Sequence, residues 1–124
     1  MAEQPKDQFD RTADFVSRYA NNTQYELHST DLRITFGEVE VNRPVQQHTA
    51  ITTTWVQAKL MIYFLQANLR IIETLFGKVI VPNDLLPAAP TAPTAEQIAA
   101  DPRAQSLFET MKEFREAFIA SNKA

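Results

Sequence analysis

The sequence predicts an α+β fold in which a small antiparallel β-sheet of three or four strands packs on one long α-helix, with an amphipathic helix at the C-terminus. Three patterns predict it. Apolar and polar residues alternate over much of 23–53, residues 55–76 are apolar around most of a helical circumference, and residues 102–120 repeat apolar side chains at helical spacing. With 124 residues, the chain is long enough for one domain with a core of its own.

The first half of the chain has the pattern of strands joined by turns. Tyr25 and Leu27 alternate with polar residues, as in a half-buried strand, and the turn-forming residues 29–31 follow. In the second strand the apolar positions shift by one residue after Gly37, which predicts a β-bulge and a bend there. A third strand, Gln46 to Thr53, is rich in β-branched residues.

The long helix has clear signals at both ends. It is predicted from Trp55 to Phe76, because Thr54 and Gln57 have the spacing of a capping box and Gly77 stands where a left-handed C-terminal residue is wanted. Such a helix is about 33 Å long.

This helix has more apolar surface than one sheet can cover. Four of its few polar side chains fall in one narrow stripe: Lys59, Gln66, Arg70 and Glu73. One apolar face is expected to pack on the sheet: Leu60, Phe64, Ile71 and Leu75. A second face then needs cover from the terminal helix or from a second subunit: Met61, Leu65, Asn68, Ile72 and Phe76. Two roles are open for Asn68, which either pairs with its symmetry mate and fixes register, or bonds a carbonyl or a water within the monomer.

The C-terminal part begins with a proline- and alanine-rich stretch, residues 82–94, that favours an extended connector. Thr94 with Gln97 then predicts a capped helical turn, and Asp101 followed by Pro102 opens the last helix. This helix ends near residue 120 and carries a stripe that should dock on an apolar surface: Leu107, Met111, Phe114 and Phe118. The predicted segments are a flexible N-terminal arm (1–18), an α+β core (19–81), the connector (82–94) and a C-terminal helical arm (95–124).

Composition narrows the classes of partner. A formal charge of −3 argues against general attraction to nucleic acid or anionic lipid. The absence of cysteine excludes disulfides and thiolate zinc sites and fits a reducing compartment, so the cytoplasm is expected. The N-terminus lacks the apolar core of a signal peptide, and the longest apolar run, 60–65, is far shorter than the ~20 residues of a membrane-spanning helix.

No residue set points to a reaction. His28 stands beside Ser29 with Asp31 nearby, but adjacent residues on a strand point to opposite faces, so an exposed strand position is the better interpretation. His48, the other histidine, is twenty residues away, and the two show no metal-ligand spacing with Asp31 or Glu38. Two glycines cannot build a phosphate-binding loop. We therefore predict no catalytic, cofactor-binding or metal-binding residues.

One stretch, 19–80, resembles a prokaryotic family catalogued as a domain of unknown function, number thirty-four sixty-seven. The residues that carry the resemblance are Tyr19, Ala20, Asn21, Ser29, Asp31, Phe36, Gly37, Ala58, Lys59, Glu73, Phe76, Gly77 and Val79. The family has no established activity, so the resemblance implies only a unit of strands followed by a long helix. More loosely, this order is similar to the architecture of the export chaperone SecB, an analogy of fold alone.

These observations predict a non-catalytic, cytoplasmic module for protein interaction and self-assembly, forming a homodimer or a larger homo-oligomer. One alternative is a small-ligand or peptide-binding, chaperone-like protein with a groove between helix and sheet, which a pocket lined by Tyr25, Phe36 and Tyr63 would favour. The other is an enzyme that uses both histidines near an acid. The biological process and the identity of any partner are not predicted.

Overall fold

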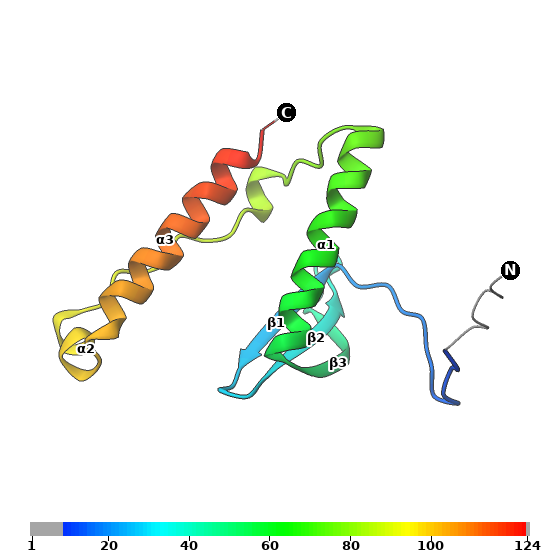
Figure 1. Ribbon diagram of the computed structural model, residues 1–124, viewed down its shortest axis with the longest axis horizontal. Helices are drawn as coiled ribbons and strands as arrows, with labels where there is room; N and C mark the ends of the chain where they lie inside the picture. Colours follow the sequence, from blue (N-terminus) through cyan, green and yellow to red (C-terminus); the bar gives the residue numbers. More distant parts are fainter. Residues whose placement is uncertain (1–8, 124) are drawn as a thin grey trace, which may run out of the picture. The chain divides into compact units, whose positions relative to one another are not determined.

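The structure, a computed structural model, describes residues 9–123. Its elements in chain order are β1 (Asn22–Leu27), β2 (Asp31–Glu38), β3 (Gln46–Thr54), α1 (Trp55–Phe76), the single-turn 3-10 helix η1 (Asn83–Leu85), α2 (Ala95–Ala100) and α3 (Arg103–Ser121) (Figure 1). The α+β class is confirmed. Of the predicted N-terminal arm, residues 1–8 lie outside the described part, and residues 9–20 contain neither helix nor strand.

Internal contacts divide the chain into two compact units, and the boundary falls inside α1. The sheet unit runs up to Tyr63, and the helical unit begins at Phe64. This division differs from the predicted core boundary at residue 81, because α1 contributes its first turns to one unit and its remaining turns to the other. Each unit is described by itself below.

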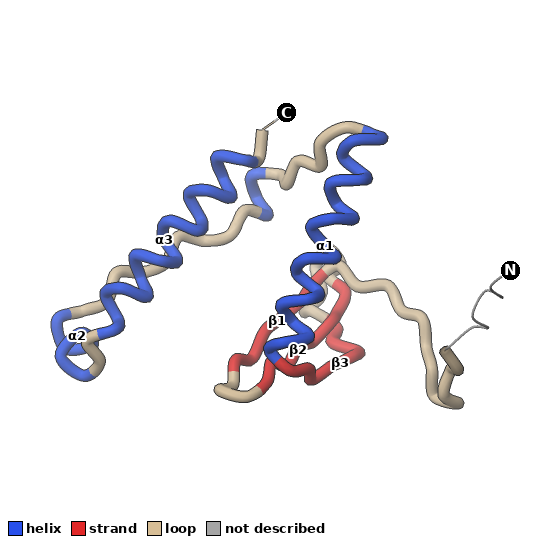
Figure 2. The backbone as a smooth tube through the Cα atoms, in the orientation of Figure 1, coloured by secondary structure: helices blue, strands red, loops and turns tan. Residues whose placement is uncertain are grey.

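The sheet unit contains one antiparallel sheet in the order β1-β2-β3 (Figure 2). β1 pairs with β2 in unbroken register, from Asn22 opposite Gly37 to Leu27 opposite Leu32. β3 runs directly into α1 with no residue between Thr54 and the helix. The three predicted strands are thus present, each within a few residues of its predicted position.

The predicted irregularity at Gly37 is present, but the extra residue belongs to the neighbouring strand. Phe36 pairs with Thr49 and Gly37 with Gln47, so His48 of β3 is the residue without a partner. A Cβ atom on Gly37 would lie 2.8 Å from the carbonyl oxygen of Gln46, which explains why glycine is required. The shift in apolar pattern beyond Gly37 has a different origin, since β2 ends at Glu38 before the two valines that produced it.

A small hydrophobic core joins β2 to the start of α1. Leu32 and Ile34 are each 7% exposed and Ala58 is 5% exposed, and Phe36 and Met61 pack against this cluster. Leu32, Ile34 and Ala58 are the buried hydrophobic residues of the described chain, a small number for its length.

Polar contacts fix the start of α1 on the same unit. The indole N–H of Trp55 donates to the carbonyl of His28 at 2.7 Å, which ties the first helical residue to the β1–β2 turn. Thr54 Oγ1 accepts from the backbone N–H of Gln57 at 3.1 Å, as its predicted capping role requires.

The prediction of which face of α1 packs on the sheet is wrong. Its members are 47–66% exposed: Leu60, Phe64, Ile71 and Leu75. The sheet instead meets the side of the helix that carries Ala58 and Met61. The small Ala58 side chain allows the closest approach to β2. The spacing of apolar residues in the sequence does not show how closely two elements can approach each other.

The helical unit follows the predicted boundaries closely. Gly77, with φ of +96°, ends α1 and donates its N–H to the carbonyl of Glu73. Thr94 and Gln97 form the predicted reciprocal capping box of α2. The connector is extended apart from η1, and Lys78–Val81 is an extended exit from α1 rather than a strand.

Candidate interaction surfaces

The larger apolar surface lies on α1. We call the exposed part of its predicted second face the α1 stripe: Leu65 (64% exposed), Asn68, Ile72 (46%) and Phe76 (80%). Met61, also predicted as a member, is partly buried against the sheet core of its own chain, so we leave it out of the stripe. Leu69, which sequence reasoning did not single out, lies on the same side and is 46% exposed.

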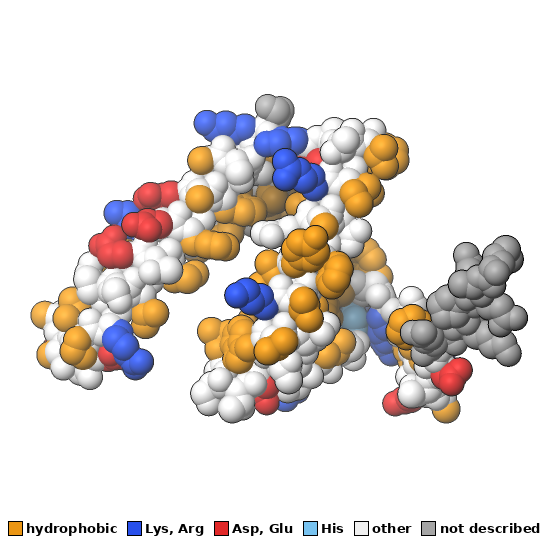
Figure 3. Space-filling model, viewed as in Figure 1, with side chains coloured by type: hydrophobic (Ala, Val, Ile, Leu, Met, Phe, Trp, Pro, Cys, Tyr) orange, Lys and Arg blue, Asp and Glu red, His pale blue; other side chains and the backbone are white. Residues whose placement is uncertain are grey.

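A second apolar surface lies on α3. The predicted α3 stripe is exposed over its length: Leu107 (59%), Met111 (56%), Phe114 (72%) and Phe118 (37%). Hydrophobic side chains line one side of α3 and acidic side chains the other in Figure 3. Within the helical unit, the large side chains of both stripes keep 37–80% of their surface exposed.

The C-terminal end of α3 is attached within its own unit. The side-chain amide of Asn122 accepts from Val81 N at 2.8 Å and donates to Val81 O at 2.9 Å, taking the place of a neighbouring strand. Lys78 Nζ donates to the carbonyl of Ser121 at 3.1 Å, near the helix end where cations are favourable. Arg115 Nε donates to the carbonyl of Pro87 at 2.7 Å. The C-terminal helix is therefore tied to the exit of α1 and to the connector.

The sheet unit contains the same arrangement, in which one asparagine side chain bonds to the backbone N–H and C=O of a distant residue. The amide of Asn21 accepts from Val39 N at 2.7 Å and donates to Val39 O at 3.2 Å, extending the β1–β2 ladder by a side chain. Sequence reasoning missed both asparagines as anchors, although Asn21 is among the residues of the family resemblance.

Other residues of that resemblance also have structural roles here. Glu73 accepts from the N–H of Val79 at 2.9 Å, which shapes the exit of α1. The carbonyl of Tyr19 contacts the His48 ring at 2.9 Å beside the bulge. Both contacts fix the conformation of the neighbouring backbone.

The two histidines are not brought together. His28 lies in the turn that opens β2, opposite Asp31, whereas His48 lies in the bulge at the other end of β2. His28 is exposed and its ring is 3.9 Å from a carboxylate oxygen of Glu26. Among the described residues, no three histidine, cysteine or acidic side chains form a group that could hold a metal ion.

The predicted groove between helix and sheet was expected to be lined by Tyr25, Phe36 and Tyr63. Phe36 instead lines a hollow of about 180 Å³ shared with the N-terminal arm, whose lining residues are Val16, Arg18, Ala20, Phe36, His48 and Thr49. None of the hollows described for the chain is lined by Tyr25 or Tyr63.

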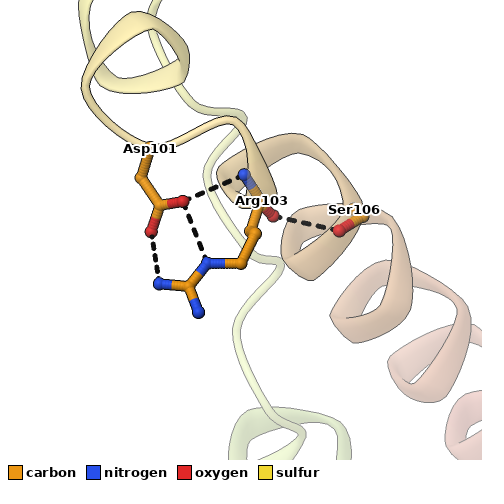
Figure 4. Close-up of polar contacts among 3 residues, drawn as sticks. All are labelled: Asp101, Arg103 and Ser106. Atoms are coloured by element: carbon orange, nitrogen blue, oxygen red, sulfur yellow. Dashed lines mark hydrogen bonds and ion pairs between the residues drawn. The ribbon is translucent and has the colours of Figure 1, made fainter.

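The joint between α2 and α3 is held by one exposed ion pair (Figure 4). Asp101 receives hydrogen bonds from Nε and Nη2 of Arg103, both at 3.1 Å, and from its backbone N–H at 3.0 Å. These bonds hold the pKa of the Asp101 carboxyl below its ordinary value and raise the pKa of Arg103. Ser106 donates to the carbonyl of Arg103 in the first turn. The arrangement caps and orients α3.

Comparisons of the chain with known protein families, with curated proteins and with solved structures find no match. No helix in residues 9–123 is sufficiently long and apolar to cross a bilayer.

Proposed function

We propose that this protein is a self-assembling interaction module whose association surface is the α1 stripe. The observation that carries the proposal is the exposure of large apolar side chains along the whole second half of α1. Soluble monomers rarely leave a contiguous apolar surface of this kind uncovered, and where one exists it commonly marks a binding site.

The area available suits a stable dimer. The three apolar members of the α1 stripe, Leu69 beside them and the four residues of the α3 stripe are each 37–80% exposed. At roughly 150–200 Å² per side chain, they expose on the order of 800 Å², similar to the ~800 Å² that each partner contributes to a standard interface. A second copy of the chain would therefore meet enough apolar surface to associate.

The spacing along α1 supports helix pairing as the mode of contact. Ala58, Met61, Leu65, Asn68 and Ile72 follow one another at intervals of three and four residues, the spacing of a coiled-coil seam. The first two members pack on the sheet, and the remaining three are exposed. Asn68, the one polar member of the seam, would set its register.

Light scattering coupled to size-exclusion chromatography tests the proposal. We expect the full chain to elute as a dimer or larger assembly, and Ile72→Glu to weaken association at least tenfold because it sets charges in the seam. Gln66→Glu is the matched control, since it adds the same charge on the polar stripe of the same helix. A folded wild-type monomer at 100 μM would overturn the proposal.

A second candidate function is the binding of an apolar peptide. It is favoured by an open hollow of about 490 Å³ between the connector and α3, whose lining includes Pro90, Pro93, Leu107, Phe108 and Met111. Fluorescence anisotropy with a labelled, unfolded apolar peptide tests it. Binding that Met111→Glu abolishes and Ile72→Glu preserves would favour this function over self-assembly alone.

The remaining assignments belong to the same proposal. We place the protein in the cytoplasm because a cysteine-free chain suits a reducing compartment. Membership of the prokaryotic family and the SecB analogy stay predictions, as do a non-enzymatic role and the exclusion of nucleic acid and membranes as partners.

A further inference from the structure

β1 forms one edge of the sheet, and half of its backbone groups point away from β2. His28 N donates to the carbonyl of Asp31, so the even-numbered positions of this strand bond to β2. The alternation of an antiparallel ladder then directs the N–H and C=O groups of Thr23, Tyr25 and Leu27 outward. This edge can accept a further strand.

The apolar face of the sheet continues onto β1 without cover. Tyr25 lies opposite Ile34 and Leu27 opposite Leu32, so each pair shares one face of the sheet. Ile34 and Leu32 are 7% exposed, whereas Tyr25 is 60% and Leu27 is 70% exposed. The cover provided by α1 thus ends at β2.

The other edge of the sheet is protected in a way that β1 is not. β3 is interrupted by the bulge at His48, whose ring also contacts the carbonyl of Tyr19. Bulges, prolines and lysines are the usual means of blocking an edge strand. β1 contains none of these, since its sequence is Asn-Thr-Gln-Tyr-Glu-Leu and its register with β2 is unbroken.

We propose that β1 strands of two copies pair antiparallel about a two-fold axis at Tyr25, so that the two sheets become one. The inference rests on the proposed self-assembly and adds a second contact surface to it. In this register, Thr23 of each copy faces Leu27 of the other, and the two Tyr25 rings meet on the apolar face. Each of the three outward positions of β1 then meets an outward position of the other copy.

The cross-strand pairs favour this register and are compatible with a second copy as the occupant. Moving the axis to Glu26 would set two carboxylates directly opposite each other, which is unfavourable. Moving it to Gln24 would set Leu27 against Asn21, whose amide is already bonded to Val39. At Tyr25, Glu26 faces neutral Gln24, so β1 is complementary to itself.

Cysteine cross-linking tests the pairing, since the chain has no native cysteine. In the proposed register, positions 24 and 26 of different copies are directly opposed, with Cβ atoms about 4.5–5.5 Å apart, near disulfide range. We expect Gln24→Cys/Glu26→Cys to form a covalent dimer on mild oxidation of the full chain. The matched control is Ala50→Cys/Thr52→Cys, with the same spacing on the same face of β3, and it should stay uncross-linked.

The single variants test the register. Glu26→Cys alone would cross-link efficiently only with the axis at Glu26, and Gln24→Cys alone only with the axis at Gln24. Either result, at a yield equal to that of the double variant, would overturn the proposed axis.

A charge substitution provides an independent readout by sedimentation equilibrium. Tyr25→Lys sets two lysines opposite each other, and we expect the dissociation constant of the assembly to rise at least tenfold. Ile51→Lys is the control, because Ile51 is also opposite Ile34, on the same face, and is 52% exposed on the β3 edge. Thermal melts verify that both variants fold.

The outcomes separate the two proposals. An oligomeric wild type whose β1 double variant cross-links no more than the β3 control would overturn β1 pairing and leave self-assembly through α1 standing. A monomeric wild type would overturn both.

Discussion

The two units of this protein hold their elements in different ways. The sheet unit has a hydrophobic core, small but continuous, in which Leu32 and Ile34 of β2 meet Ala58 of α1. The helical unit has no buried hydrophobic side chain in its described residues, and its parts are joined chiefly by hydrogen bonds from Asn122, Lys78 and Arg115. The helical unit therefore has less internal burial to stabilise it.

The asparagine hydrogen bonds found in both units show the same difference between them. Asn21 extends a ladder that already has a core beneath it, whereas Asn122 connects a helix end to the chain where no core exists. The same two hydrogen bonds should therefore matter more in the helical unit.

The largest expected effect tests the core of the sheet unit. Ile34→Ala should destabilise this unit by about 2 kcal/mol, at the low end for such substitutions because the core is shallow and can partly collapse. Urea unfolding followed by the fluorescence of Trp55, the single tryptophan, measures it. The matched control is Ile51→Ala, at an exposed position across the ladder, which should cost well under half as much.

The next effect concerns the close approach at the bulge. Gly37→Ala should cost about 1–3 kcal/mol, since a Cβ atom 2.8 Å from the Gln46 carbonyl forces the backbone apart. The same unfolding assay applies. Gly77→Ala is the contrasting variant: its Cβ meets nothing, but its φ of +96° imposes strain, so it should act on the helical unit instead. Equal Trp55 responses from both variants would contradict this assignment.

Replacing either asparagine should lower stability by less than the glycine substitutions, and by different amounts in the two units. Asn122→Ala should cost about 1–2 kcal/mol locally, and Asn21→Ala somewhat less because its bonds are more exposed to water. Amide hydrogen exchange at Val81 and Val39 reports each loss separately. A larger increase in the exchange rate at Val39 in Asn21→Ala than at Val81 in Asn122→Ala would reverse the comparison of the two units.

The smallest effect is the ion pair at the start of α3. Asp101 has a lowered pKa in the folded protein, so its contribution to stability is present above its ordinary carboxyl range and is lost as the pH falls through the folded value. Asp101→Asn should lower the thermal midpoint slightly at pH 7 and leave it unchanged near pH 2. A difference that persists in acid would assign the effect to another cause.

Much of the fold was accessible from the sequence because its signals are local. The bounds of α1, the glycine that ends it and the Thr94 capping box all depend on residues within one turn of each other. The strands followed from alternation, and their order from short turns.

The failures come from interactions between distant residues. Which face of α1 meets the sheet depends on how closely Ala58 approaches β2, and no periodicity contains that distance. The anchors join residues 18 and 41 positions apart, Asn21 with Val39 and Asn122 with Val81. The α1 and α3 stripes were found as candidates because hydrophobicity is visible in sequence, whereas the open edge of β1 required the strand order and its hydrogen-bond phase.

The direct passage from β3 into α1 has a mechanical consequence. Because no loop separates Thr54 from Trp55, the helix cannot turn about its axis independently of the strand that feeds it. Adding or deleting one residue at the junction would turn the first helical side chains by about 100° about the helix axis. The pairing of Thr49 to Thr54 with β2, which is unbroken up to the helix, thus sets the direction in which Ala58 enters the core.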